Sequence, residues 1–122
     1  MCVTGALRAG HELMQKIADP GFRCYYVWTP ILAADSEAAA RYNEGAMQQR
    51  GARHYWDPDR SFERHMAVAL GLDVAWDLYL LYPRGDPAIE QPDFWMHQLD
   101  TDKAPRLDPE VLKNRITEKL GR

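Results

Sequence analysis

Cysteine is scarce in this sequence, and so are long apolar runs and surplus basic charge. Two cysteines are too few for the disulfide framework of a small secreted scaffold. The longest uncharged run, Cys24 to Ala34, is too short to span a membrane and contains Pro30. The 15 basic and 18 acidic residues leave a net charge of −3, which argues against a general binder of nucleic acid or anionic membranes. No basic head followed by an apolar stretch opens the chain, so we expect no signal peptide and a cytoplasmic location.

The 122 residues have the proportions of one globular domain, residues 1–122. Hydrophobic residues make up 46% and charged residues 27%, and no repeat or Ser/Gly linker divides the chain. A chain of this length buries enough surface to form a core without a metal or a disulfide. We therefore expect no cofactor.

Four helices are expected. The first covers residues 3–18, and the second, 38–49, is a strong helix former with little apolar content. Ser61 is the expected cap of the third, which Gly71 closes. Asp108 followed by a proline begins the fourth. The buried stripes predicted for the last two helices are Phe62, Met66, Ala69 and Leu70, and Val111, Leu112, Ile116 and Leu120.

Four strands are expected, at residues 22–29, 52–56, 74–82 and, more loosely alternating, 94–99. The first and third carry apolar side chains on both faces, which is typical of interior strands covered on both sides. The order of elements predicts an α/β domain of three layers, a mixed sheet with helices on both faces.

Several segments resemble bacterial thioredoxin-like proteins that are distantly similar to the alkyl hydroperoxide reductase and thiol-specific antioxidant group. They are CVTGA (2–6), VWTPIL (27–32), HYWDP (54–58), AWDLYLLY (75–82) and WMHQL (95–99). The resemblance implies a thioredoxin-like sandwich and a thiol–disulfide or peroxide redox role. Cys2 would be the nucleophile or the resolving thiol, acting on a protein thiol or disulfide partner.

The sequence departs from that family in three ways. Cys2 matches the second cysteine of the family's C-x-x-C motif, so the first cysteine and the strand leading to it would lie before residue 1. Residues 71–75 also lack the family's cis-proline. The fold is therefore expected to be N-terminally truncated. Two explanations stay open: Met1 is an internal methionine, or the sheet closes by rearranging or by dimerising.

The second explanation leaves an apolar edge between strands 22–29 and 74–82, and such an edge invites pairing with another chain. It makes the chain a non-catalytic module that acts by forming a homodimer or by binding another protein. This is the alternative to the redox function.

Cys2 itself lies at the start of a predicted helix, where the helix dipole favours the reactive thiolate. The alternative is a frayed terminal residue whose thiol does nothing. Cys24 lies in the middle of an aromatic strand, where packing in the core is the expected role of a free cysteine.

A second candidate site lies at the ends of the first two strands, where α/β folds often place a cleft. A histidine–carboxylate pair, His54 with Asp57, could act there as acid and base in a hydrolytic or binding cleft. The alternative is turn chemistry, with Asp35 as a helix cap and Asp57 as an Asx turn. The candidate binding residues are Trp28, Asp35, His54, Trp56 and Asp57.

The remaining polar signals are weaker. The four histidines show no metal-ligand spacing, so we predict no metal site. Asp77 is the one acid within an apolar strand, and a buried carboxylate needs a partner. His97, on a possible neighbouring strand, is one candidate partner, and an arginine is another. The alternative is that Asp77 lies at a solvent-facing or edge position.

Overall fold

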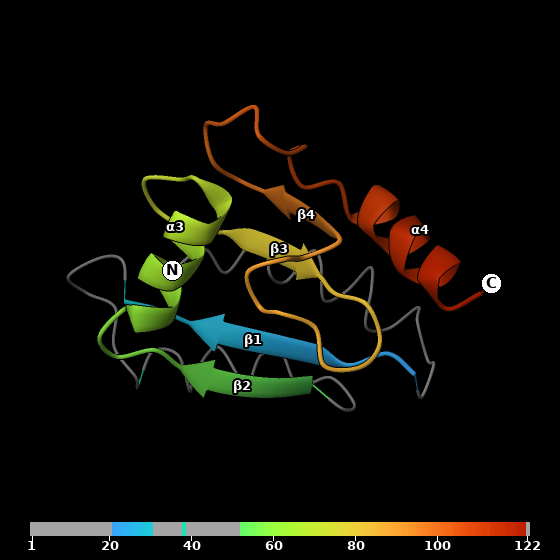
Figure 1. Cartoon of the computed structure of the whole chain (residues 1–122), viewed down its shortest axis with the longest axis horizontal. Coiled ribbons are helices and arrows are strands. Elements are labelled where there is room, and N and C mark those ends of the chain that lie inside the picture. Colours follow the sequence, from blue (N-terminus) through green and yellow to red (C-terminus); the bar gives the residue numbers. More distant parts are fainter. Residues whose placement is uncertain (1–20, 31–37, 39–51, 122) are drawn as a thin grey trace.

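The computed structural model describes residues 21–30, 38 and 52–121, and these residues form a mixed α/β arrangement (Figure 1). The α/β class is thereby confirmed. The predicted helix 3–18 lies outside the described residues, as does helix 38–49 apart from Ala38. The described elements are β1 (Cys24–Trp28), β2 (Ala52–Trp56), α3 (Ser61–Leu70), β3 (Leu78–Leu81), β4 (Phe94–His97) and α4 (Pro109–Lys119).

The four strands form two separate pairs in the described part of the chain, rather than one continuous mixed sheet. β1 and β2 are parallel, with Tyr26 opposite His54 and Trp28 opposite Trp56. β3 and β4 are antiparallel, with Leu78 opposite His97. In Figure 1 the parallel pair runs below the antiparallel pair.

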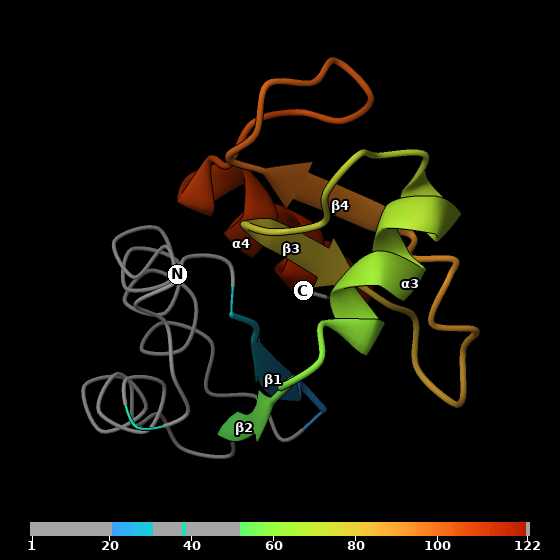
Figure 2. The same cartoon turned by 90° about the vertical axis from the view of Figure 1, so that its left-hand side faces the viewer.

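Both faces of the β3–β4 pair are covered, as predicted for the apolar segment that contains β3. Leu78 and Leu80 pack against the Met66 side of α3. Tyr79 and Leu81, which point the other way, pack with Met96 against Leu112 and Ile116 of α4. Figure 2 shows the two helices on opposite sides of this pair.

β3 is shorter than the predicted strand 74–82, because Asp77 has a φ of 54°. This left-handed conformation is incompatible with a strand, and aspartate is one of the few side chains that tolerate it. The strand therefore begins only at Leu78.

α3 begins differently from the prediction. Ser61 is the first helical residue and not the cap, and the residue in the cap position, Arg60, has no capping side-chain hydrogen bond. Ala69 of the predicted stripe is exposed. Ala67 is buried instead, because it lies beside Met66 in the cluster that packs against β3. Gly71 does close the helix, with a φ of 69°.

α4 follows its prediction closely. The Asp108 side chain accepts hydrogen bonds from the amides of Glu110 and Val111, and Pro109 occupies the first turn. Leu112 and Ile116 are buried. Val111 is the exception in the predicted stripe, because it lies on the solvent side of the helix.

Candidate functional site

Two of the predicted site residues, Trp28 and His54, are in direct contact on one face of the β1–β2 pair. The indole Nε1–H of Trp28 donates a hydrogen bond to His54 Nδ1 over 3.1 Å. The Tyr26 ring stacks on the same imidazole, with centroids 4.7 Å apart and an interplanar angle of 6°. The three rings are nearly parallel and form an aromatic ladder (Tyr26, Trp28 and His54).

The hydrogen bond with Trp28 fixes the state of His54. An indole N–H can only donate, so Nδ1 must accept, and the imidazole proton lies on Nε2. The lone pair that a general base would use at Nδ1 is already engaged. The geometry suits His54 to hold the two strands together and to donate from Nε2.

Asp57 is buried and its carboxylate is used by α3. One oxygen accepts from the Ser61 hydroxyl and the Phe62 amide, each at 3.3 Å, and the other accepts from the Glu63 amide at 3.2 Å. The Asp57 amide donates to the Trp28 carbonyl at 2.8 Å. Asp57 therefore fits neither expectation: its carboxylate caps α3 instead of pairing with His54 or forming an Asx turn, and the Asx-type bond, from the Ser61 amide, is made by Asp59 at 3.1 Å.

The other predicted site residues are placed only in part. Trp56 is half-buried and lies opposite Trp28 in the strand register, so the two side chains share the face of the aromatic ladder. Cys2 and Asp35 lie outside the described residues. The structure thus brings Trp28, His54 and Trp56 to one face, with Asp57 directly after them.

The opposite face of the β1–β2 pair is exposed to solvent. Tyr25 is 57% exposed and Tyr55 49%, Val27 is also exposed, and the two tyrosine rings stack with centroids 6.3 Å apart. Arg53, opposite Tyr25 in the register, is exposed as well. Within residues 21–30 and 52–121 nothing covers this face, which we call the outer patch (Tyr25, Val27, Arg53 and Tyr55), so the prediction that strand 22–29 is covered on both sides does not hold for it there.

Arg53 was the available sequence signal for this exposure. A charged residue aligned with aromatic residues of the neighbouring strand marks a face that touches water. The sequence of β1 alone does not show this charge, because Arg53 belongs to the strand that pairs with β1.

Cys24, on the ladder side of β1, is half-buried. Burial raises the pKa of its thiol to about 11, and a side-chain hydrogen bond with Tyr26 opposes part of that rise. Since the thiolate is the nucleophile, this thiol is inert near neutral pH. The expected role in packing agrees with that environment.

Two buried polar residues were not anticipated as such. Glu63 is 2% exposed, and it accepts from the Ala75 amide at 2.8 Å and from Arg60 Nη2 at 3.2 Å. His97 is fully buried, and both ring nitrogens bond the backbone, at Leu99 and Ala104. The hypothesis that Asp77 is the partner of the His97 ring is therefore wrong, because the loop after β4 already supplies both partners.

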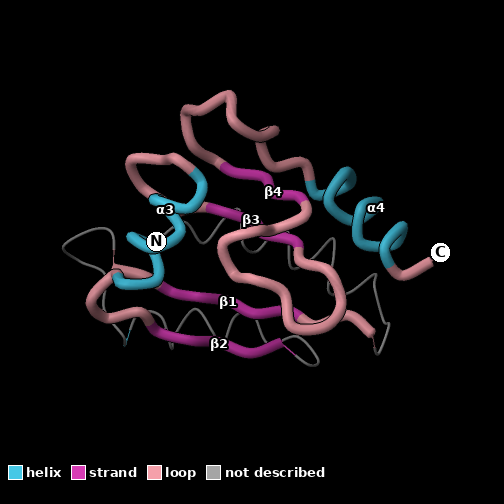
Figure 3. Tube along the Cα trace, viewed as in Figure 1, coloured by secondary structure: helices cyan, strands magenta, loops and turns pink. Residues whose placement is uncertain are grey.

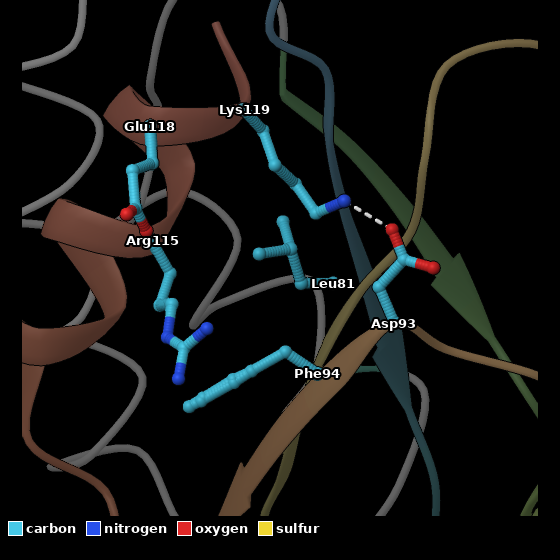
Figure 4. Close-up of a pocket in the computed structure, with 6 residues that line it drawn as sticks. All are labelled: Leu81, Asp93, Phe94, Arg115, Glu118 and Lys119. Carbon is cyan, nitrogen blue, oxygen red and sulfur yellow. Dashed lines mark hydrogen bonds and ion pairs between the residues drawn. The ribbon is translucent and has the colours of Figure 1, made fainter.

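A hollow of about 440 Å³ lies between α4 and the β3–β4 pair (Figure 4). The Arg115 guanidinium lies 4.7 Å from the centre of the Phe94 ring, and Lys119 forms an ion pair with Asp93. With Glu118, the lining holds two cations and two carboxylates, so it offers no net charge to an ionic ligand. Its lining residues are Leu81, Asp93, Phe94, Arg115, Glu118 and Lys119.

The described ranges also bear on metal binding and on membrane insertion. No group of three or more His, Cys, Asp or Glu side chains is arranged there to hold a metal ion. No helix in the same part of the chain is long and apolar enough to cross a membrane.

The site geometry can be set beside what is known of other proteins. No protein-family model, curated protein or solved structure matches this chain.

Proposed function

We propose that this chain is a non-catalytic, thioredoxin-like binding module that associates with a second copy of itself through the outer patch. The observation that carries the proposal is the exposure of two stacked tyrosines, Tyr25 and Tyr55, on one sheet face. Tyrosine and arginine are enriched in protein interfaces, where the tyrosine ring is covered and its hydroxyl stays wet.

The chemistry of the patch favours a second copy as the occupant. A two-fold interface places the same patch on both sides, so the patch must be complementary to itself. The outer patch holds both a cation, Arg53, and aromatic rings that attract a cation. Arg53 of one copy can lie over a tyrosine of the other, and the reverse contact follows by symmetry.

The inner face of the same strands supports binding over catalysis. Cys24 carries a protonated thiol near neutral pH, Asp57 is committed to α3, and the Nδ1 of His54 is bonded to Trp28. These groups stiffen the strands that display the outer patch. A rigid patch loses little conformational entropy when it binds.

Sedimentation velocity across micromolar concentrations tests the proposal. We expect the wild type to sediment as a dimer and Tyr55→Glu to weaken the dimer by at least about tenfold, since an interface tyrosine is a common hot spot. Arg53→Glu, which leaves both rings in place, should also weaken it. The matched control is Val68→Glu on α3, because Val68 is 84% exposed and lies outside the patch.

Far-UV circular dichroism checks that each variant is folded. A wild type that stays monomeric up to about 100 µM, which corresponds to a dimerisation free energy weaker than about −5.5 kcal/mol, contradicts the proposal. So does a Val68→Glu variant that weakens the dimer as much as Tyr55→Glu.

The redox function through Cys2 is the alternative proposal, and two cysteine variants separate it from binding. Turnover of a disulfide or peroxide substrate that Cys2→Ser abolishes and Cys24→Ser retains would favour the redox role. Dimerisation that survives Cys2→Ser, without turnover in the wild type, supports the binding module.

A further inference from the structure

His97 ends β4 and holds the loop that follows it. The ring Nε2 lies 2.7 Å from the Ala104 carbonyl oxygen, and Nδ1 lies 2.9 Å from the Leu99 amide nitrogen. A carbonyl can only accept and an amide N–H can only donate, so Nε2 carries the proton and Nδ1 accepts. The contacts therefore specify the neutral ring.

The backbone of the same residue binds the far end of the loop. The His97 amide donates to Pro105 at 3.2 Å, and the Leu107 amide donates to the His97 carbonyl at 2.7 Å. Residues 98–107, which we call the return loop, leave β4 and come back beside it before α4 begins (Figure 3). One residue thus fastens both ends of the return loop.

The surroundings of His97 exclude water. The side chain is 0% exposed, lies 5.9 Å from the Trp95 ring, and shares its sheet face with Leu78, which packs against α3. A second proton on the ring would be a buried charge, which is costly without a compensating partner. The elements around it carry these charged groups: Glu63 on α3, Asp77 before β3, and Asp100, Asp102, Lys103 and Arg106 in the return loop.

Several of those groups are already committed. Glu63 bonds Ala75 and Arg60, and Lys103 bonds the Gly71 carbonyl at the end of α3. Arg106 donates to the Leu99 carbonyl at 2.6 Å, which keeps a positive charge on the loop that His97 holds.

We propose that His97 is an acid-sensitive latch of the return loop. Proton uptake at Nδ1 turns the acceptor into a donor that faces the Leu99 N–H, so the hydrogen bond breaks. The charged ring then gains more from water than from its buried position, and it leaves with the loop. The latch is closed when the ring is neutral and opens on acidification.

Amide hydrogen exchange followed by NMR tests the latch in the whole chain. After correction for intrinsic exchange, we expect protection of the Leu99 amide to fall about tenfold for each pH unit once opening takes up one proton. The Leu112 amide, bonded to Asp108 within α4, serves as the internal reference and should keep its protection. Equal loss at Leu99 and Leu112 contradicts a local latch and indicates global unfolding.

The matched variant is His97→Gln. Its side-chain amide can donate to Ala104 and accept from Leu99 but does not titrate, so the Leu99 protection should become independent of pH. A variant with the same pH dependence as the wild type overturns the proposal. If the variant does not fold, the wild-type ring resonances decide: an Nδ1–H tautomer at neutral pH, or a ring titration that does not coincide with the loss of Leu99 protection, also overturns it.

Discussion

Trp28 and His54 show how a single hydrogen bond decides what a residue can do. The sequence placed an imidazole near a carboxylate at the end of two strands, which is a reasonable pattern for acid–base chemistry. Residue type cannot tell which neighbour takes the Nδ1 lone pair. The parallel register places the indole N–H of Trp28 at that lone pair, and the Asp57 carboxylate bonds the amides of α3 instead.

Cys24 gives a prediction at the same scale. Its thiol pKa is raised from 9.0 to about 11, and each pH unit changes the thiolate fraction tenfold. In a Cys2→Ser background, we expect iodoacetamide to alkylate native Cys24 at pH 8 about a hundredfold more slowly than in the unfolded chain. Mass spectrometry of timed aliquots measures both rates.

The raised thiol pKa also determines how the free energy of unfolding changes with pH. The folded state favours the protonated thiol, so the stabilisation is complete below pH 9 and is lost as the pH rises towards 11. In urea unfolding, the free energy of unfolding of Cys24→Ala should therefore fall less between pH 9 and 11 than that of the wild type. Native alkylation as fast as in the unfolded chain would contradict the buried position of the thiol.

Among the elements, α3 shows where local sequence rules stop. A serine before an apolar run predicts a cap, but Asp57 reaches the same amides from outside the helix and offers two oxygens instead of one hydroxyl. The turn Asp57-Pro58-Asp59 is what brings that carboxylate back to the helix.

Asp57→Ala is therefore expected to lower the free energy of unfolding by about 2–3 kcal/mol, because buried amides of α3 lose their acceptors. The matched variant is Asp59→Ala, which removes an exposed carboxylate that bonds Ser61 at the helix start and accepts no hydrogen bond from a buried amide. Urea denaturation should show a clearly smaller loss for Asp59→Ala. Equal losses would mean that Asp57 does not cap the helix.

Local patterns predicted most described elements and missed their ends or faces. The strands around residues 24–28 and 52–56 and the helix from Pro109 are confirmed, because β-branched and aromatic runs and the Asp-Pro signal act over a few residues. Asp77 shortens β3 through its left-handed backbone conformation. An aspartate tolerates that conformation but does not require it, so the residue type alone does not predict it. The exposure of Tyr25 depends on what packs above it, and no local pattern carries that information.

At the scale of the whole molecule, the α/β class followed from composition and element order. The buried state of His97 did not, because its partners Leu99 and Ala104 become neighbours only when the return loop closes. The same holds for Glu63, whose partner Ala75 lies beyond the end of α3. The burial of such polar residues cannot be predicted from local sequence, because it depends on hydrogen-bond partners from other segments of the chain.

Leu112 tests whether the described parts unfold together. It lies in the cluster that joins α4, both strands of the antiparallel pair and Phe22 before β1. Leu112→Ala should cost about 2–5 kcal/mol, the range for an emptied leucine site. Tryptophan fluorescence, which samples all four tryptophans of the chain, and far-UV circular dichroism should shift to the same new midpoint. Separate midpoints would show that the described parts do not unfold in one step.

That cluster also sets a schedule for biosynthesis. Phe22 precedes β1, but the cluster against which it packs includes Leu112 and Ile116 of α4, so about ninety residues must be translated before that cluster is complete. At ordinary ribosomal rates this is a delay of several seconds. Through that interval Phe22 lacks the apolar cover that α4 supplies, so chaperones that bind apolar side chains have access to the nascent chain at Phe22.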